Sequence, residues 1–209
     1  MLEFPTLPHV ALAAAAAGTR LVHVSSDAVF SGTASSYDET CLPDPVTPYG
    51  AAKAAAETSV KGISRGAVIV RTSLIIGDEG DSQHERLVHA LACGAAAGVL
   101  YTDNVRCPVH VTDLAAALLE LASSAYAGVC HVAGPDAVSR YELGLLIAAR
   151  DGLDRAALPA GLCAATDRPG PLDVRLDSNR TQARVATRLR GAREFLAPAP
   201  SSEGAGDFR

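Results

Sequence analysis

A tyrosine and a lysine four positions apart are the residues of this sequence best suited to acid–base chemistry. Tyr49 and Lys53 lie in the stretch PYGAAK, and Lys53 is one of two lysines in a chain that has 16 arginines. On a helix these positions share one face, with Cβ atoms about 5–6 Å apart. A nearby ammonium group lowers the pKa of a tyrosine from its usual value of about 10, because it stabilises the phenolate. We therefore expect Tyr49 to donate a proton and Lys53 to tune it.

A hydroxyl group at the end of a strand would complete such a site. Ser26 ends the apolar stretch 20–26, and Asp27 follows it directly. Ligands of doubly wound sheets bind at the carboxyl ends of strands, so both residues are well placed to contact one. The alternative is that Ser26 and Asp27 only begin a turn. Their combination with Tyr49 and Lys53 favours the functional interpretation.

Strand-like and helical segments alternate along the chain. Four apolar runs predict buried strands, at 20–26, 66–73, 98–102 and 128–134. Helices are predicted over 5–18, 47–62, 83–97, 112–124 and 139–150, with Thr47, Thr112 and Ser139 as N-caps. This alternation predicts an α/β fold built on a doubly wound parallel sheet.

Composition excludes several classes of partner. The formal charge of −5 argues against nucleic acid, and no apolar run reaches the length of about 18 residues that would span a membrane. No basic segment precedes the apolar N-terminal stretch, so we predict no signal peptide and a cytoplasmic protein. The five scattered cysteines are then expected to be buried reduced thiols. His84 and His89 are five positions apart and would not share a helix face, so no metal site is predicted.

Several stretches resemble one enzyme superfamily. HVSSDAVFSG (23–32) and PYGAAKAAAE (48–57) look like the Ser/Thr-Tyr-Lys core of the extended short-chain dehydrogenase/reductases. The nearest branch is the RmlD-like dTDP-4-dehydrorhamnose reductase family, and the likeness extends along residues 11–196. Supporting stretches are VIVRTSLIIG (68–77), CPVHVTDLAAALLEL (107–121), GVCHVAGPDAVSRYEL (128–143) and RPGPLDVRLD (168–177).

The resemblance implies a reductase that moves a hydride from NADP or NAD to a keto group of a nucleotide sugar. Tyr49 would protonate the oxygen, and Lys53 would also hydrogen-bond the nicotinamide ribose. Ser26 would polarise the carbonyl, and Asp27 would lie beside the sugar. Arg106 would face the diphosphate, with a surface salt bridge as the alternative role.

The resemblance also implies a partial fold. Residues 1–152 would form the carboxyl part of a Rossmann-like domain, and residues 153–196 a small substrate-binding region. The composition of residues 197–209 separately predicts a disordered tail. In this superfamily a strand, a glycine-rich turn and a helix hold the cofactor pyrophosphate. No G-x-x-G-x-x-G occurs here, so we expect the N-terminal cofactor segment to be missing.

Three explanations of the missing segment stay open. The first is a start placed too late, the second is a genuine truncation, and the third is a fold that serves as a regulatory or binding module. The regulatory subunit of methionine adenosyltransferase resembles the same branch and is a precedent for the third explanation. Without the first strands, an open sheet edge would need a partner or a second copy of the chain to cover it.

Overall fold

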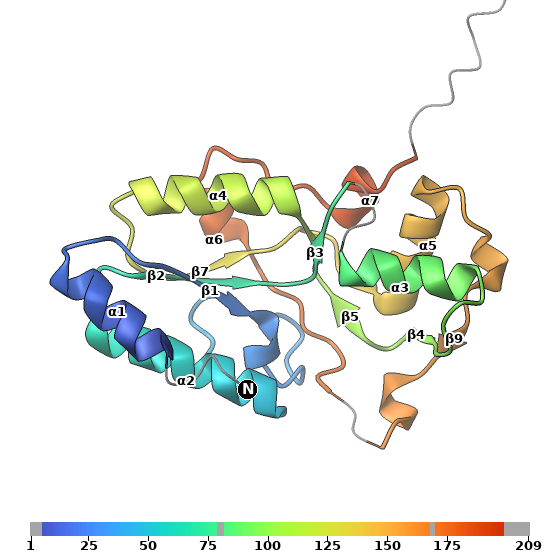
Figure 1. The fold of residues 1–209 in the computed structure, drawn as a ribbon, viewed down its shortest axis with the longest axis horizontal. Helices are drawn as coiled ribbons and strands as arrows, with labels where there is room; N and C mark the ends of the chain where they lie inside the picture. The colour runs from blue at the N-terminus through green and yellow to red at the C-terminus, as the bar shows by residue number, and fades with distance from the viewer. Residues whose placement is uncertain (1–5, 79–81, 168–169, 199–209) are drawn as a thin grey trace, which may run out of the picture.

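Three strands with valine in each form the centre of the molecule. The computed structural model describes residues 6–78, 82–167 and 170–198. Strands β1 (Val22–Ser26), β2 (Val68–Thr72) and β7 (Gly128–Val132) form a parallel sheet of order β1-β2-β7. Figure 1 shows α1 (Thr6–Ala16) and α2 (Pro48–Ile63) on one face and α4 (Val111–Ser123) on the other. The predicted α/β fold with a parallel sheet is confirmed.

Short elements make up the rest of the chain. Helices α3 (Gln83–Ala92) and α5 (Arg140–Arg150) pack together beside the sheet (Figure 1). Three strand pairs accompany them: β3 (Ile75–Ile76) with β6 (Val109–His110), β4 (Leu100–Tyr101) with β9 (Ala160–Gly161), and β5 (Val105–Arg106) with β8 (Val138–Ser139). The remaining elements are η1 (Asp27–Val29), η2 (Arg155–Ala157), η3 (Cys163–Ala165), α6 (Asn179–Gln182) and α7 (Ala192–Phe195).

Two of the three predicted helix caps are present. Thr47 accepts a hydrogen bond from Gly50 N, and Ser139 accepts one from Glu142 N. The cap of α4 is His110 rather than Thr112, because the helix begins at Val111 and His110 Nδ1 accepts from Thr112 N. Helix α3 ends at Ala92 instead of 97, since Gly94 turns the chain with a φ of 71°.

Residues 153–196 do not form an apolar core of their own. Leu158 and Leu196 belong to the cluster around α3 and α5, Leu176 packs near Phe30, and Leu189 packs under α4. The segment therefore runs across the molecule and contributes to three separate apolar clusters. Its role in substrate binding stays a prediction, and the predicted tail beyond residue 198 lies outside the described residues.

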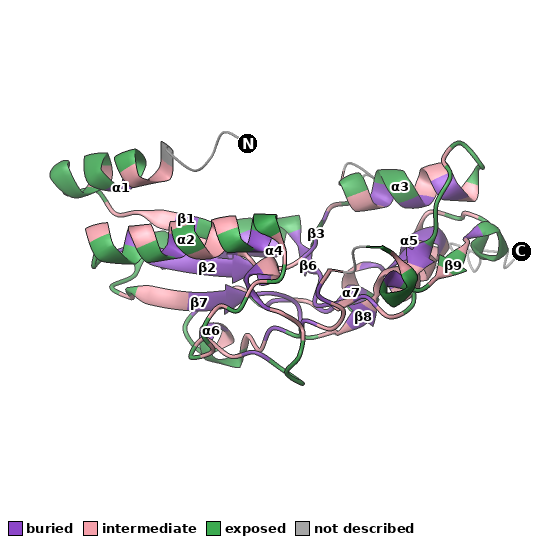
Figure 2. Cartoon of the chain, turned by 90° about the horizontal axis from the view of Figure 1, so that it is seen from below, coloured by how far each residue is buried: buried purple, intermediate pink, exposed green. Residues whose placement is uncertain are grey.

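The open sheet edge expected from the sequence is present in the described part of the chain. β1 hydrogen-bonds to β2 on one side only, and Val24 in its middle is 38% exposed. Figure 2 shows the two remaining central strands more fully buried than β1. Among the described helices none has the length and apolar content needed to cross a bilayer.

None of the five cysteines is in a disulfide. Three are buried, and burial raises the pKa of Cys107 to about 11 and that of Cys130 to about 12. Cys93 is exposed and Cys41 is half-buried, so the expectation of buried thiols is wrong for these two residues. Cys93 is exposed because it follows the last residue of α3, at the helix end.

A buried ion pair joins α2 to the sheet. Glu57 and Arg71 are each 1% exposed, with 2.8 Å between Arg71 Nη2 and Glu57 Oε2. Ser25 donates its hydroxyl to Glu57 Oε1 at 2.6 Å, and Ser25 lies beside Arg71 in the strand register. Burial alone would raise the pKa of Glu57, but the hydrogen bonds and charge of Arg71 and the Ser25 hydroxyl lower it. One carboxylate thus connects α2, β1 and β2.

The variant Arg71→Met leaves the Glu57 charge buried without its partner. We expect it to lower the free energy of unfolding by about 3–5 kcal/mol, measured by urea denaturation. Arg65→Met removes an exposed arginine of the same region and should change it by less than about 0.5 kcal/mol. A loss below about 1 kcal/mol for Arg71→Met would show that this ion pair does not hold the elements together.

Gly50 lets α2 touch the segment that follows β1. A Cβ atom at this position would lie 2.0 Å from the carbonyl oxygen of Ala28 in η1. No other residue type fits this contact without moving backbone. The glycine of PYGAAK therefore sets the distance between the helix that carries Tyr49 and the turn that carries Asp27.

The variant Gly50→Ala should force α2 away from η1. We expect a loss of about 1–3 kcal/mol in unfolding free energy, measured by chemical denaturation, because overpacking shifts the backbone. Gly62→Ala is the matched control in the same helix, since a Cβ there meets nothing within 4 Å. The Gly62→Ala substitution should leave the free energy of unfolding unchanged or raise it by about 0.5–1 kcal/mol. Equal effects of the two substitutions would contradict a specific role of Gly50.

Candidate functional site

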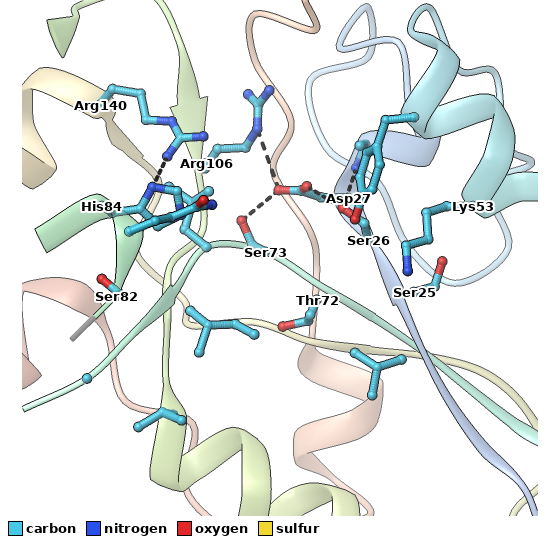
Figure 3. Close-up of a pocket in the computed structure, with 18 of the residues that line it drawn as sticks. Ser25, Ser26, Asp27, Lys53, Thr72, Ser73, Ser82, His84, Arg106 and Arg140 are labelled. Atoms are coloured by element: carbon cyan, nitrogen blue, oxygen red, sulfur yellow. Dashed lines mark hydrogen bonds and ion pairs between the residues drawn. The ribbon is translucent and has the colours of Figure 1, made fainter. Parts of the chain in front are cut away.

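A cavity of about 980 Å³ lies at the carboxyl ends of β1 and β2. The three residues predicted as a catalytic group, Ser26, Tyr49 and Lys53, all line it. Asp27 and Arg106, predicted to contact substrate, line it as well. Figure 3 shows Ser26 and Lys53 on one side of this cavity, with Asp27 between them and Arg106. The structure thus brings together residues from three separate segments of the chain: the end of β1 with η1, the start of α2, and β5.

Ser26 is held by its own turn. Its Oγ accepts a hydrogen bond from Ala28 N at 3.2 Å and donates one to Asp27 Oδ1 at 3.3 Å. Ser26 therefore caps η1, as the turn alternative predicted, while also lining the cavity. The two interpretations are compatible, because the cap fixes where the hydroxyl lies.

Tyr49 and Lys53 lie one turn apart on α2. Lys53 Nζ is 5.8 Å from the centre of the Tyr49 ring, and the tyrosine is 55% exposed. Pro48 begins the helix and Thr47 caps it, so both side chains leave the first two turns. The phenol and the ammonium group are thereby presented at the same cavity wall, where a ligand can reach them.

Asp27 is buried and already has partners. Its Oδ2 accepts the Ser73 hydroxyl at 2.7 Å and lies 3.5 Å from Arg106 Nε. Asp27 is 6% exposed and Arg106 is 7% exposed. The surface salt bridge offered as the alternative role of Arg106 is therefore wrong: its ion pair is buried between η1 and β5.

Most donors of Arg106 bind backbone carbonyl oxygens. Nη1 donates to Val105 O and Leu172 O, and Nη2 donates to Pro171 O at 2.6 Å. These bonds hold the segment around residue 171 against β5. Arg106 thus supplies positive charge to the cavity wall, but it has few N–H groups left for a ligand.

Two residues that the sequence analysis did not assign to the site lie on the far wall. His84 at the start of α3 and Arg140 at the start of α5 line the cavity, and Arg140 Nη1 donates to His84 Nδ1 at 3.0 Å (Figure 3). Burial lowers the pKa of His84 to about 4, and the charge of Arg140 acts in the same direction. The available signal was an arginine at the first position of a helix, where the macrodipole disfavours a cation.

A smaller cavity of about 320 Å³ adjoins the first. His84, Arg106 and Arg140 line both, and the other lining residues are mainly apolar: Leu87, Val88, Val99, Leu100, Leu143 and Ile147. A charged wall therefore separates a polar cavity from an apolar one. Within the described ranges no group of three or more metal-ligating side chains is present.

The arrangement suits the reduction or protonation of a bound carbonyl group. A hydroxyl, a phenol and an ammonium group line one cavity, and these are the groups that donate hydrogen bonds or protons to a developing alkoxide. Apolar side chains at the ends of the sheet strands, Val24, Leu74 and Ile75, line another part of the wall. Such a wall can hold the face of a planar ring.

Known proteins resemble this chain along most of its length. The dTDP-4-dehydrorhamnose reductase of Mycobacterium tuberculosis (strain ATCC 25618 / H37Rv) is 31% identical over 199 residues, which are 91% of this chain and 66% of the relative. Methionine adenosyltransferase 2 subunit beta of Xenopus laevis is 30% identical over 178 residues, which are 81% of this chain and 52% of the relative. The chain thus spans about half to two thirds of these relatives.

Solved structures agree in fold. The dTDP-4-dehydrorhamnose reductase of Bacillus anthracis str. Ames in complex with NADP has a TM-score of 0.81 at 24% identity, over 91% of this chain and 68% of that one. MoeE5 in complex with UDP-glucuronic acid and NAD has a TM-score of 0.76 at 27% identity, over 91% and 67%. The profile of the RmlD substrate binding domain matches residues 4–199, so the chain belongs to the RmlD substrate-binding-domain family.

Proposed function

We propose that this protein reduces a keto group of a nucleotide sugar with a nicotinamide cofactor, as dTDP-4-dehydrorhamnose reductases do. The supporting observation is that Ser26, Tyr49 and Lys53 line one cavity at the carboxyl ends of two parallel strands. Relatives named for this activity and the complex of MoeE5 with a UDP-sugar add weight to the substrate class.

The residues present fit the nicotinamide half of such a cofactor. Lys53 and Tyr49 offer donors for ribose hydroxyls, and Val24, Leu74 and Ile75 offer an apolar face for the ring. The described long helices offer no glycine-rich backbone cradle for the pyrophosphate, because α2, α3, α4 and α5 each begin at a residue capped by a side chain instead. When bound, the cofactor would supply a hydride to the carbonyl carbon.

The chain's own residues would manage the oxygen. The Ser26 hydroxyl, whose oxygen is held by Ala28 N, would turn its proton from Asp27 Oδ1 to the carbonyl oxygen and donate a hydrogen bond there. Tyr49 would give its phenolic proton to that oxygen as negative charge develops there. Lys53 would keep a positive charge beside the phenol, and the Asp27–Arg106 pair would hold the wall on which the sugar lies.

A second candidate function is a regulatory or binding module on the same fold. Two observations favour it: the likeness to methionine adenosyltransferase 2 subunit beta, and the lack of a pyrophosphate cradle among the described residues. In that role the same cavity would bind a ligand without turnover. A cytoplasmic location remains part of the proposal for either function.

Tyr49→Phe tests the proton donor. We expect turnover of a dTDP-linked 4-keto sugar with NADPH to fall by about 10²–10⁴-fold, because the donated proton is lost. Cofactor affinity should change little. Tyr141→Phe removes a phenol outside both cavities and is the control. Unchanged turnover in Tyr49→Phe would remove Tyr49 from the proposed chemistry.

Cofactor binding by the 209-residue chain separates the two candidate functions. We expect NADPH or NADH to bind with a Kd in about the millimolar range, weaker than a dinucleotide whose pyrophosphate is held by a helix N-terminus. Fluorescence of the reduced nicotinamide measures this affinity. If neither cofactor binds at about 10 mM, well above the expected Kd, this polypeptide alone is not a working reductase, and the binding-module function is favoured.

A further inference from the structure

Arg140 has no carboxylate partner in the part of the chain that the structure describes. Its Nε donates to Asn104 Oδ1 at 3.2 Å, and its Nη1 donates to His84 Nδ1 at 3.0 Å. Its other N–H groups make no hydrogen bond to the described residues. Arg106 differs, because its donors bind Asp27 and three carbonyl oxygens. The cavity wall thus contains one guanidinium group with donors to spare.

An unpaired cation at this place is costly to the folded protein. Burial lowers the pKa of Arg140 to about 10 and the nearby charge of Arg106 acts in the same direction, while the carboxylate of Asp27, which is itself paired with Arg106, opposes them only in part. The group stays protonated at neutral pH, so its charge must be balanced by solvent or by an anion. Arg140 is also the first residue of α5, where the helix dipole adds positive potential. A bound anion would offset both the uncompensated charge of Arg140 and the positive potential at the start of the helix.

His84 adds an uncharged donor beside this cation. Because its Nδ1 accepts from Arg140, the neutral ring carries its proton on Nε2. Burial lowers the pKa of His84, Arg140 lowers it further, and Glu85 opposes them; Arg106, Asp27 and Asp78 are the other charged groups on this part of the cavity wall. The ring therefore stays neutral near pH 7 and can donate one N–H to a ligand oxygen.

We propose that Arg140 and His84 together bind a phosphate group of the ligand, Arg140 by charge and His84 by a neutral N–H. Figure 3 shows both across the cavity from Ser26 and Lys53. They also line the smaller apolar cavity, so a phosphate bound here would lie between the reacting end of a ligand and an apolar end. The phosphate site itself does not depend on the proposed function. Only the identity of the molecule that carries the phosphate rests on it.

The size and lining of the smaller cavity fit a planar base. Its volume of about 320 Å³ is lined by aliphatic side chains of α3, α5 and the segment at β4, with Gly144 in its wall. A side chain at Gly144 would collide with Leu100, since a Cβ there would lie 2.4 Å from Leu100 Cδ1. A nucleoside diphosphate would thus find its phosphates at Arg140 and its base against the aliphatic wall.

Calorimetric titration of the full chain with pyrophosphate, UDP, dTDP and NADPH tests the assignment. We expect Arg140→Met to weaken the diphosphate ligands by about tenfold or more, Arg140→Lys to restore part of the loss, and His84→Leu to weaken them about tenfold. Arg188→Met and His89→Gln are the matched controls, because they remove an exposed arginine and a histidine outside both cavities. Both controls should bind like the wild type.

The probes distinguish the source of the phosphate. If the variants bind UDP or dTDP more weakly and NADPH with unchanged affinity, the site belongs to the sugar nucleotide. The reverse result assigns it to the cofactor. Unchanged affinity for every probe in both variants would overturn the phosphate site, even where the wild type turns over substrate and the proposed function stands. Failure of every diphosphate to bind the wild type would overturn it together with the proposed substrate class.

The imidazole nitrogens of His84 give a second, independent readout. Long-range ¹H–¹⁵N correlation spectra should show Nε2 protonated and no titration from about pH 5.5 to about pH 8. Arg140→Met should release the ring to both tautomers, an effect that loss of stability alone would not cause. A His84 ring that titrates at about pH 6.5 in the wild type would contradict its role as a neutral donor.

Discussion

The buried contact of Glu57 with Arg71 and Ser25 is the interaction on which the site depends. Glu57 lies two turns beyond Tyr49 and one turn beyond Lys53 on α2, so fixing it fixes the rotation of the helix. Ser25 precedes Ser26 on β1, and Arg71 occupies the same register on β2. One carboxylate therefore aligns the phenol and the ammonium group of α2 with the hydroxyl at the end of β1. The close approach of Gly50 to Ala28 sets the remaining distance between them.

The two arginines that line the cavity have different electrostatic roles. Arg106 compensates the buried Asp27 carboxylate and binds carbonyl oxygens, so it mainly maintains the wall. Arg140 has no such carboxylate among the residues that the structure describes, and it lies opposite the proposed reaction centre (Figure 3). A ligand with an anionic middle and two uncharged ends matches this distribution. Such a ligand would contact α2 and β1 at one end and α3 and α5 at the other.

Local sequence signals were sufficient for the long elements and the group around α2. Continuous apolar runs indicated the three parallel strands, and Thr47 with Pro48 indicated the start of α2. Two-residue strands such as β5 and β8 could not be predicted, because their pairing depends on contacts between distant segments. Arg140 and His84 were missed for the same reason: each becomes part of the cavity only when α3 and α5 pack together. Arg106 was found through the resemblance, whereas its structural partners could be seen only in the fold.

Residues 153–196 connect the separate apolar clusters of the molecule. Leu158 and Leu196 complete the cluster around α3 and α5, while Leu176 and Leu189 complete the clusters beside the sheet. Because this one segment packs against both parts of the molecule, unfolding of either part would remove packing contacts from the other. We therefore expect the sheet and the α3–α5 part to unfold in a single cooperative transition. A ligand bound in the cavity between them would raise the melting temperature of the whole chain.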